Sequence, residues 1–234
     1  MNINSFYEEV KKLDINLTKN QMDMLEKYYE LLVTENEKIN LTTITEKEDV
    51  YLKHFYDSLT LIKAYNLRKE ATLCDVGTGA GFPGLVLAIC FPNLKVTVVE
   101  SIRKKIDFLF LVKKELDLKN LFICNERAEI FARNNVEKYD IVTSRAMARL
   151  NMLNEMCIPL VKVNGYFIPM KANLDEELEE AKTSIEIMNS RLEEVITFNL
   201  PVENSVRNLV VIKKLGNNKK KYPREYKQIK NMPL

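Results

Sequence analysis

Glycine is distributed very unevenly along this chain of 234 residues. The sequence has six glycines, and the stretch CDVGTGAGFPG contains four of them: Gly77, Gly79, Gly81 and Gly84. Glycine is needed where the backbone takes a positive φ or where another atom approaches it closely. A cluster of this kind between an apolar run and a helix is typical of a nucleotide-like ligand on a strand-to-helix turn. The cluster therefore predicts a ligand site, against the alternative of an ordinary tight loop.

The N-terminal third is predicted to be helical. Residues 1–76 contain neither glycine nor proline. Two capping boxes, Thr18 with Gln21 and Thr45 with Glu48, predict helix starts, and apolar residues follow each at helical spacing.

From residue 71 onward, short β-rich runs alternate with helical stretches. Strands are predicted at Leu73–Val76, Lys95–Val99, Leu121–Cys124, Tyr139–Thr143, Gly165–Met170, Glu194–Phe198 and Leu209–Lys213. Helices are predicted at about 83–91, 103–117, 126–133, 150–162 and 174–192. Such alternation implies parallel pairing through right-handed crossovers and an open sheet covered by helices on both faces.

Composition excludes several classes of protein. No apolar run reaches the length of a membrane span, and residues 1–20 lack a signal core. Four widely spaced cysteines and a single histidine argue against a disulfide framework and against a metal site. Residues 216–234 hold six basic residues against Glu225 alone, which is +5; since the chain totals +2, the rest carries −3. Two interpretations of this tail stay open, a solvated end and a phosphate-binding arm.

Two acidic residues at strand ends bear on the ligand class. Residues 79–84 fit the dinucleotide pattern GxGxxG, and Glu100 ends the second strand, where a ribose partner is expected. Asp75, however, would repel a pyrophosphate beside the turn. S-adenosylmethionine has no phosphate and carries a sulfonium and an ammonium. We therefore favour it over a nicotinamide cofactor, with Asp75 near its amino-acid end and Glu100 on its ribose hydroxyls.

Motifs of other methyl-transfer chemistries are missing. No NPPY or DPPY motif and no Pro-Cys nucleophile follows Tyr139–Thr143. His54 has Asp57 and Ser58 three and four residues later on a predicted helix face; a structural histidine is the preferred interpretation and a general base the alternative. Guanine N7 has a free lone pair and no proton to lose, so methylation there needs alignment but no base.

The blocks DVGTGAGFPGL, VESIRKKIDFL, ERAE and YDIVTSRAMARL resemble the RsmG (GidB) family of bacterial small-subunit rRNA guanine-N7 methyltransferases. NLTTI, HFYDSL, IPMKA and NLVVIKK extend the similarity over about residues 30–215. The resemblance implies a class I methyltransferase fold: an open, mostly parallel, seven-stranded Rossmann-like α/β sheet with helices on both faces and an N-terminal helical extension. It also implies methyl transfer from S-adenosylmethionine to N7 of one guanine in 16S rRNA.

The resemblance assigns roles at matching positions. Gly77 and Phe82 would line the cofactor pocket, Ala128 and Glu129 would contact its adenine side, and Arg145 would reach the cofactor or the RNA. The expected cofactor site comprises Gly77, Gly79, Phe82, Glu100, Ala128, Glu129 and Arg145. No catalytic base and no metal are expected.

We expect three segments: a helical extension at residues 1–66, a methyltransferase domain at 67–215 and a basic tail at 216–234. The protein is expected to be a monomeric cytoplasmic enzyme, free of membranes, whose partner is 16S rRNA or the small ribosomal subunit. Two alternatives stay open: a class I methyltransferase acting on a small molecule or a protein, and a ribosome-assembly factor without activity.

Overall fold

A seven-stranded sheet forms the centre of the computed structural model, which describes residues 1–174 and 176–234. Its strands are β1 (Ala71–Val76), β2 (Leu94–Glu100), β3 (Leu121–Asn125), β4 (Tyr139–Arg145), β5 (Val161–Lys171), β6 (Ser190–Asn199) and β7 (Val206–Lys214). They lie in the order β3-β2-β1-β4-β5-β7-β6. The first five pair in parallel, and β7 runs antiparallel to both of its neighbours. All seven predicted strands are confirmed, because each predicted range lies inside an observed strand.

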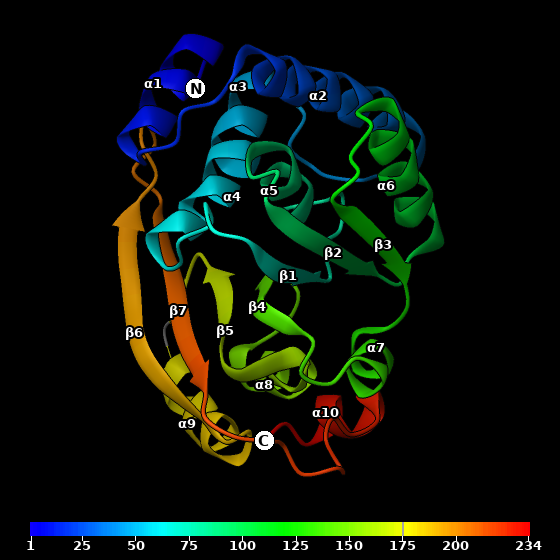
Figure 1. Cartoon of the computed structure of the whole chain (residues 1–234), viewed down its shortest axis with the longest axis vertical. Coiled ribbons are helices and arrows are strands. Elements are labelled where there is room, and N and C mark those ends of the chain that lie inside the picture. Colours follow the sequence, from blue (N-terminus) through cyan, green and yellow to red (C-terminus); the bar gives the residue numbers. More distant parts are fainter. Residues whose placement is uncertain (175) are drawn as a thin grey trace.

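Helices cover both faces of this sheet (Figure 1). One face carries α1 (Ile3–Lys12), α2 (Lys19–Ile39), α3 (Lys47–Val50), α4 (Asp57–Leu59), α5 (Gly84–Cys90) and α6 (Arg103–Glu115). The other face carries α7 (Ala128–Asn134), α8 (Leu150–Cys157), α9 (Glu177–Ile187) and α10 (Tyr226–Asn231). The five helices predicted after residue 83 correspond to α5–α9; Asp175, inside the last predicted range, lies outside the described residues. No described helix has both the length and the apolar character needed to span a bilayer.

The central strands β1 and β4 are largely buried on both faces because helices cover both faces of the sheet. In β1, Leu73 packs into the core shared with the N-terminal helices, and the next residue, Cys74, packs into the core under α7 and α8. Side chains alternate between the two faces of a strand, so one short apolar run serves both layers.

The N-terminal helices form part of the main core. Phe6, Leu25 and Tyr28 are completely buried and join the cluster that contains Leu73 of β1. These helices therefore pack against the sheet and do not form a separate core.

Two predicted helix starts differ in outcome. The box at the start of α2 is confirmed: Gln21 N donates to Thr18 Oγ1 at 3.2 Å, and Thr18 N donates to Gln21 Oε1 at 2.9 Å. The box at Thr45 is wrong, because α3 begins at Lys47 with Glu46 as its uncapped N-terminal neighbour. Thr45 and Glu48 have the spacing of a capping box, but α3 starts one residue after the position at which Thr45 could cap it.

The helical segment that begins at α3 changes its winding. It passes into a π-helical turn, η1 (Tyr51–Tyr56), then α4, then a 3-10 turn, η2 (Thr60–Lys63). π-helical turns occur frequently at functional sites. This one carries His54 to the edge of the sheet.

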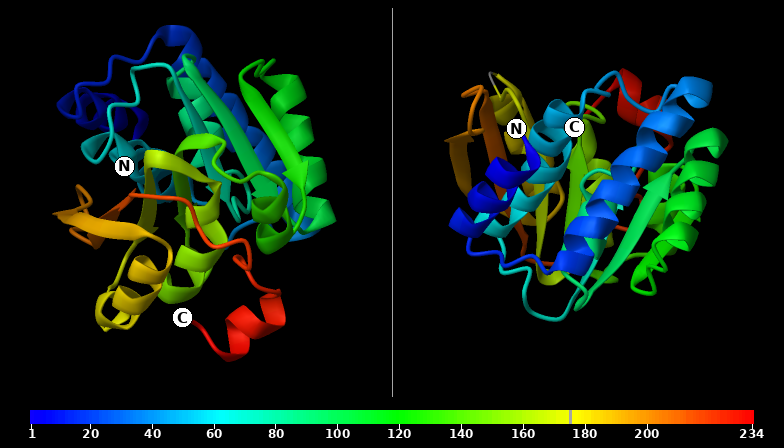
Figure 2. Two further views of the ribbon diagram at one scale, coloured as in Figure 1. Left: turned by 60° about the horizontal axis from the view of Figure 1, so that its bottom comes forward. Right: turned by 90° about the horizontal axis from the view of Figure 1, so that it is seen from above.

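The C-terminal segment is docked on the protein. After β7 the chain returns past α8 and forms α10, which lies beside α7 and α8 (Figures 1 and 2). Ile229 of α10 is completely buried. The second half of the basic tail is therefore helical and packed on the protein, and its five lysines are exposed.

Candidate functional site

A cavity of about 440 Å³ opens at the carboxyl ends of β1 to β4. Its wall comes from the glycine-rich turn after β1, from Glu100 at the end of β2, from the β3–α7 connection and from Arg145 at the end of β4. Open parallel sheets bind ligands at this edge, near the point where strand order reverses. Strand β1 lies between β2 and β4 and marks that point. The volume lies within the range of small-molecule sites, roughly 300–1,000 Å³.

The turn after β1 depends on its glycines. Gly77 has φ of 71° and Gly79 has φ of 62°, a region that side-chain-bearing residues rarely adopt. An added Cβ at Gly77 would also overlap the sulfur of Met147. Gly77 N and Thr78 N donate to Val99 O at 2.9 and 3.2 Å, which fixes the turn against β2. The backbone thus lines the cavity directly.

Asp75, at the end of β1, stabilises this turn through hydrogen bonds. Its carboxylate is completely buried, and Oδ2 accepts from Thr78 Oγ1 at 2.5 Å and from Gly84 N at 2.8 Å. Burial raises its pKa to about 6, although both hydrogen bonds act to lower it. Asp75 does not line the cavity in the described structure. The expected contact between Asp75 and the ligand is therefore not built into this site, and Asp75 acts by shaping the loop.

Glu100 presents a preorganised carboxylate at the middle of the cavity. Its Oε1 accepts from Ser101 N at 2.8 Å and Ile102 N at 2.9 Å, and its Oε2 accepts from Gly79 N at 3.1 Å. The side chain is buried but lines the cavity. A carboxylate has about four lone-pair positions, so three backbone donors leave capacity for a ligand hydroxyl. This arrangement fits the ribose of S-adenosylmethionine.

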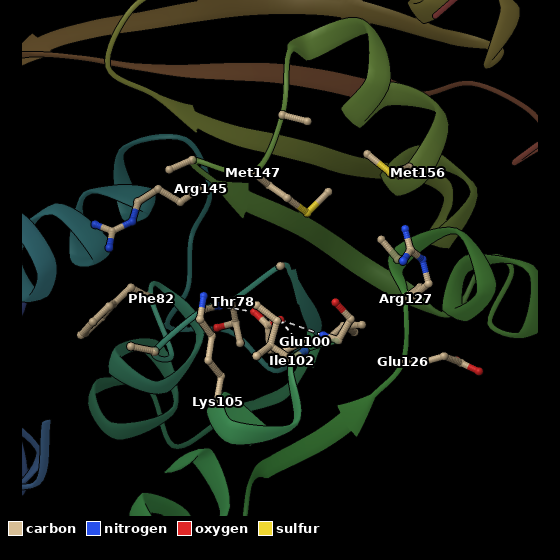
Figure 3. A pocket seen from close by; sticks show the side chains of 18 of the residues that line it. Thr78, Phe82, Glu100, Ile102, Lys105, Glu126, Arg127, Arg145, Met147 and Met156 are labelled. Carbon is tan, nitrogen blue, oxygen red and sulfur yellow. Dashed lines mark hydrogen bonds between the residues drawn. The ribbon is translucent and has the colours of Figure 1, made fainter. Parts of the chain in front are cut away.

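Arg145 lies at the opposite side of Glu100 from the β3–α7 connection (Figure 3). Its Nη1 donates to Lys53 O at 2.8 Å and to Asp57 Oδ2 at 3.1 Å, and its Nη2 lies 3.1 Å from His54 Nδ1. A guanidinium has donors only, so His54 Nδ1 accepts and Nε2–H donates to Thr42 Oγ1 at 3.0 Å. The sequence placed His54 with Asp57 and Ser58, but the π-helical turn directs its side chain to Thr42 and Arg145 instead.

His54 is a positioning residue in this cluster. Its ring stacks on Phe82 with centroids 4.3 Å apart and an interplanar angle of 17°. The Arg145 guanidinium lies 5.4 Å from the centre of the same Phe82 ring. Burial, followed by the Arg145 charge, lowers the pKa of His54 to about 3. The imidazole is therefore neutral and fully engaged, which favours the structural interpretation over the general base.

A second cavity of about 370 Å³ adjoins the first. The two cavities share His54, Arg145 and Ala146. Ala146 follows β4 with φ of 52°, an unfavourable conformation for alanine that is typical of functional sites. Charged side chains of the second cavity are Lys53, Asp57, Arg145, Lys171 and Arg207. Acidic partners balance these cations: Lys53 pairs with Asp49 and Glu203, Lys171 with Glu177, and both arginines with Asp57.

All seven residues expected for the cofactor site line the first cavity: Gly77, Gly79, Phe82, Glu100, Ala128, Glu129 and Arg145. Sequence reasoning missed other lining residues, among them Thr42, Lys105, Arg127, Met147 and Tyr226. Lys105 lies in the VESIRKKIDFL block, but three basic residues are adjacent there, and the sequence does not show which of them faces the cavity. Thr42 lies in the NLTTI block, but no role was assigned to it; Tyr226 lies outside the quoted blocks, and its approach depends on the tertiary fold.

The sequence matches one known protein family over most of its length. A model of the GidB family, described as rRNA small subunit methyltransferase G, matches residues 21–210. The chain belongs to this family.

Relatives in the GidB family are similar along their whole length. The chain is 48% identical over 237 residues to Ribosomal RNA small subunit methyltransferase G of Bacillus cytotoxicus, covering 100% of this chain and 99% of the relative. It is 50% identical over 228 residues to the protein of that name from Bacillus subtilis, covering 96% of this chain and 95% of the relative.

A solved structure supports the fold. The SAM-dependent methyltransferase of Aquifex aeolicus superposes with a TM-score of 0.53 at 17% identity, covering 77% of this chain and 97% of that one. The expected Rossmann-like class I methyltransferase fold is thus confirmed.

Proposed function

We propose that this protein transfers a methyl group from S-adenosylmethionine to N7 of a guanine in 16S rRNA. The observation that carries this proposal is the family match over residues 21–210, together with full-length relatives named Ribosomal RNA small subunit methyltransferase G. The cavity at the glycine-rich turn supports it, since Glu100 offers a buried carboxylate to a ribose and the turn offers bare backbone.

S-adenosylmethionine, when bound, supplies an electrophilic methyl group. Gly77, Gly79 and Phe82 would form the floor and side of its site, and Glu100 would accept from its ribose hydroxyls. Ala128 and Glu129 would lie on the adenine side. Arg145 would orient the reacting end or contact an RNA phosphate.

The second cavity supports the entry of a nucleotide at this reacting end. Lys53, Lys171 and Arg207 line it with hydrogen-bond donors, and a phosphate of RNA would take the place of their present acidic partners. His54, Arg145 and Ala146 line both cavities, so a nucleotide held in the second would reach the donor where the two cavities meet. Guanine N7 needs no proton removed, so the reaction does not require a base, and His54 is neutral and already hydrogen-bonded to Thr42.

We propose in addition that the protein acts as a monomer in the cytoplasm. The relatives' names support a ribosomal substrate, which is cytoplasmic in bacteria.

Mapping N7-methylguanine in rRNA tests this function. Cells lacking the gene should lose one N7-methylguanine in 16S rRNA, and the restored gene should return it. The purified protein should then methylate 16S rRNA or small subunits prepared from the deficient cells, and the two substrates separate naked RNA from the assembled particle. An unchanged N7-methylguanine profile, with methylation of a small molecule or a protein, would contradict the proposal.

A further inference from the structure

The C-terminal segment is held against the cavity by a buried ion pair. Arg224 Nε donates to Glu155 Oε1 at 2.9 Å, Arg224 Nη2 donates to Oε2 at 2.7 Å, and Arg224 N donates to Oε1 at 2.8 Å. The Glu155 side chain, on α8, is completely buried. Such a two-pronged pair fixes geometry, and a buried carboxylate left without its partner is strongly unfavourable. Arg224 is therefore bound to the body of the protein and does not extend into solvent.

A second set of contacts fixes the same segment to α7. Arg133 Nε donates to Pro223 O at 2.9 Å, and Arg133 Nη1 donates to Glu225 Oε1 at 2.6 Å. Ile229 is completely buried in the core shared with α8. Anchors on both sides of position 226 therefore fix where α10 begins.

The first residue of α10, Tyr226, forms part of the cavity wall. The Arg127 guanidinium lies 4.7 Å from the centre of its ring, and Arg127 Nε donates to Glu129 Oε1 at 2.9 Å. Tyr226 thus joins Arg127, Ala128 and Glu129 at the β3 side of the cavity. The family match ends at residue 210, so this part of the wall lies beyond it.

The β3 side is the adenine end. Glu100 ends β2, in the middle of the edge, and suits the ribose; Arg145 and the second cavity lie on the β4 side, where the methyl group must meet its acceptor. Figure 3 shows Arg145 and Phe82 at one end of the cavity, Glu126 and Arg127 at the other, and Glu100 between them. The base attached to the ribose must then lie towards Arg127.

We propose that Tyr226 is a cofactor-binding residue that packs against the adenine of S-adenosylmethionine, and that the Glu155–Arg224 pair positions it. This inference rests on the proposed function, because it takes S-adenosylmethionine as the ligand. The C-terminal segment is then a strap that closes the adenine end of the site, with its lysines facing solvent.

Calorimetry on the full chain tests the role of Tyr226. Tyr226→Ala should weaken the binding of S-adenosylmethionine and of adenosine alone about tenfold, the order expected for loss of one base–aromatic contact. Tyr226→Phe, which keeps the ring, should bind within about twofold of the wild type. Gln228→Ala, on the exposed side of the same helix, is the matched control and should leave affinity unchanged. With rRNA as substrate, Tyr226→Ala should raise KM for S-adenosylmethionine while kcat stays constant.

A double variant tests the positioning role of the ion pair. Arg224→Gln should weaken binding as Tyr226→Ala does, and the two changes together should be no worse than Tyr226→Ala alone. Additive losses would refute the positioning role, since they mean that the pair acts independently of Tyr226. Arg224→Lys, which keeps the charge but loses the two-pronged contact, serves the same test if Arg224→Gln does not fold.

The outcomes separate this inference from the proposed function. If the wild type binds S-adenosylmethionine and Tyr226→Ala binds it equally well, the inference is overturned and the enzyme remains. If the wild type does not bind S-adenosylmethionine, the proposed function itself fails.

Discussion

His54 is kept neutral by its surroundings. Burial, and then the Arg145 charge, lower its pKa to about 3, whereas an unfolded chain has a histidine pKa of about 6.5. As pH falls from about 6.5 towards 3, the unfolded state gains a proton that the folded state does not, so folding stability decreases. Asp75 acts in the opposite sense: burial raises its pKa from 3.8 to about 6, so its contribution to stability decreases as pH rises through that window.

Because the chain has a single histidine, the lowered pKa of His54 can be observed directly. In NMR spectra, the His54 ring resonances should stay constant from pH 8 to pH 5, because the imidazole does not gain a proton in that range. A peptide containing residues 50–60 provides the control and should titrate near 6.5. A titration of the folded protein near 6.5 would show that Arg145 and burial do not act on His54 as described.

Glu100 offers a second prediction at the level of one residue. Glu100→Gln keeps the size of the side chain but removes its charge, and charge-assisted hydrogen bonds are about twice as strong as neutral ones. Affinity for S-adenosylmethionine should fall roughly tenfold in calorimetry, which corresponds to about 1.4 kcal/mol. Glu115→Gln, exposed on α6 and outside the cavity lining, is the control with the same change of charge. Equal affinities for Glu100→Gln and wild type would remove Glu100 from the site.

Several site residues could be predicted from the sequence because they belong to contiguous motifs. Gly77, Gly79 and Glu100 follow directly from the strand-to-helix turn and the end of the next strand. Arg127 lies in the quoted ERAE block and was missed beside Ala128 and Glu129, whereas Tyr226 could not be predicted, since it reaches the cavity only through docking of the C-terminal segment. The orientation of Asp75 could not be predicted from the sequence, because it depends on the hydrogen bonds by which Thr78 and Gly84 hold Oδ2 within the turn.

Of the two capping boxes in the sequence, one predicts a helix start correctly and the other does not. Thr18 caps α2, so Thr18→Ala should lower the free energy of unfolding by about 1 kcal/mol. Thr45 precedes α3 but does not cap it, and Thr45→Ala should therefore change stability by less than about 0.5 kcal/mol. Urea denaturation of the two variants measures this difference. Equal losses would contradict the assigned helix starts.

The strands could be predicted from the sequence because each strand of a sheet covered by helices is a short apolar run between polar turns. Helix α10 was not, because one buried residue, Ile229, gives no periodic pattern. It is held mainly by Arg224 and Glu155, which are 69 residues apart in sequence. The turn η1 was also missed, since the helical spacing of its apolar residues does not distinguish an α-helix from one π-helical turn.

For the whole molecule, the division into residues 1–66, 67–215 and 216–234 stays a proposal. The N-terminal helices share one core with β1, and the C-terminal segment is bound to α7 and α8. We propose that the three segments act as one unit around the cavity.

Substitution of the exposed lysines of the C-terminal segment distinguishes a solvated end from a phosphate-binding arm. Replacing Lys219, Lys220 and Lys221 by Gln should reduce the salt dependence of RNA binding if they contact phosphates, by about 0.7 to 0.9 in the log–log slope per contact. The same replacement at Lys12, Lys27 and Lys38 on the N-terminal helices is the matched control. Binding titrations at several salt concentrations measure the slopes. Equal slopes for the two triple variants would show that the tail lysines are only solvated.

We infer that the cavity at the glycine-rich turn selects S-adenosylmethionine over a dinucleotide. Calorimetric titration of the purified full-length protein with S-adenosylmethionine and, separately, with NAD tests it most directly. We expect saturable binding of S-adenosylmethionine, weakened by Glu100→Gln, and no binding of NAD. Saturable binding of NAD, or no binding of S-adenosylmethionine, would contradict it.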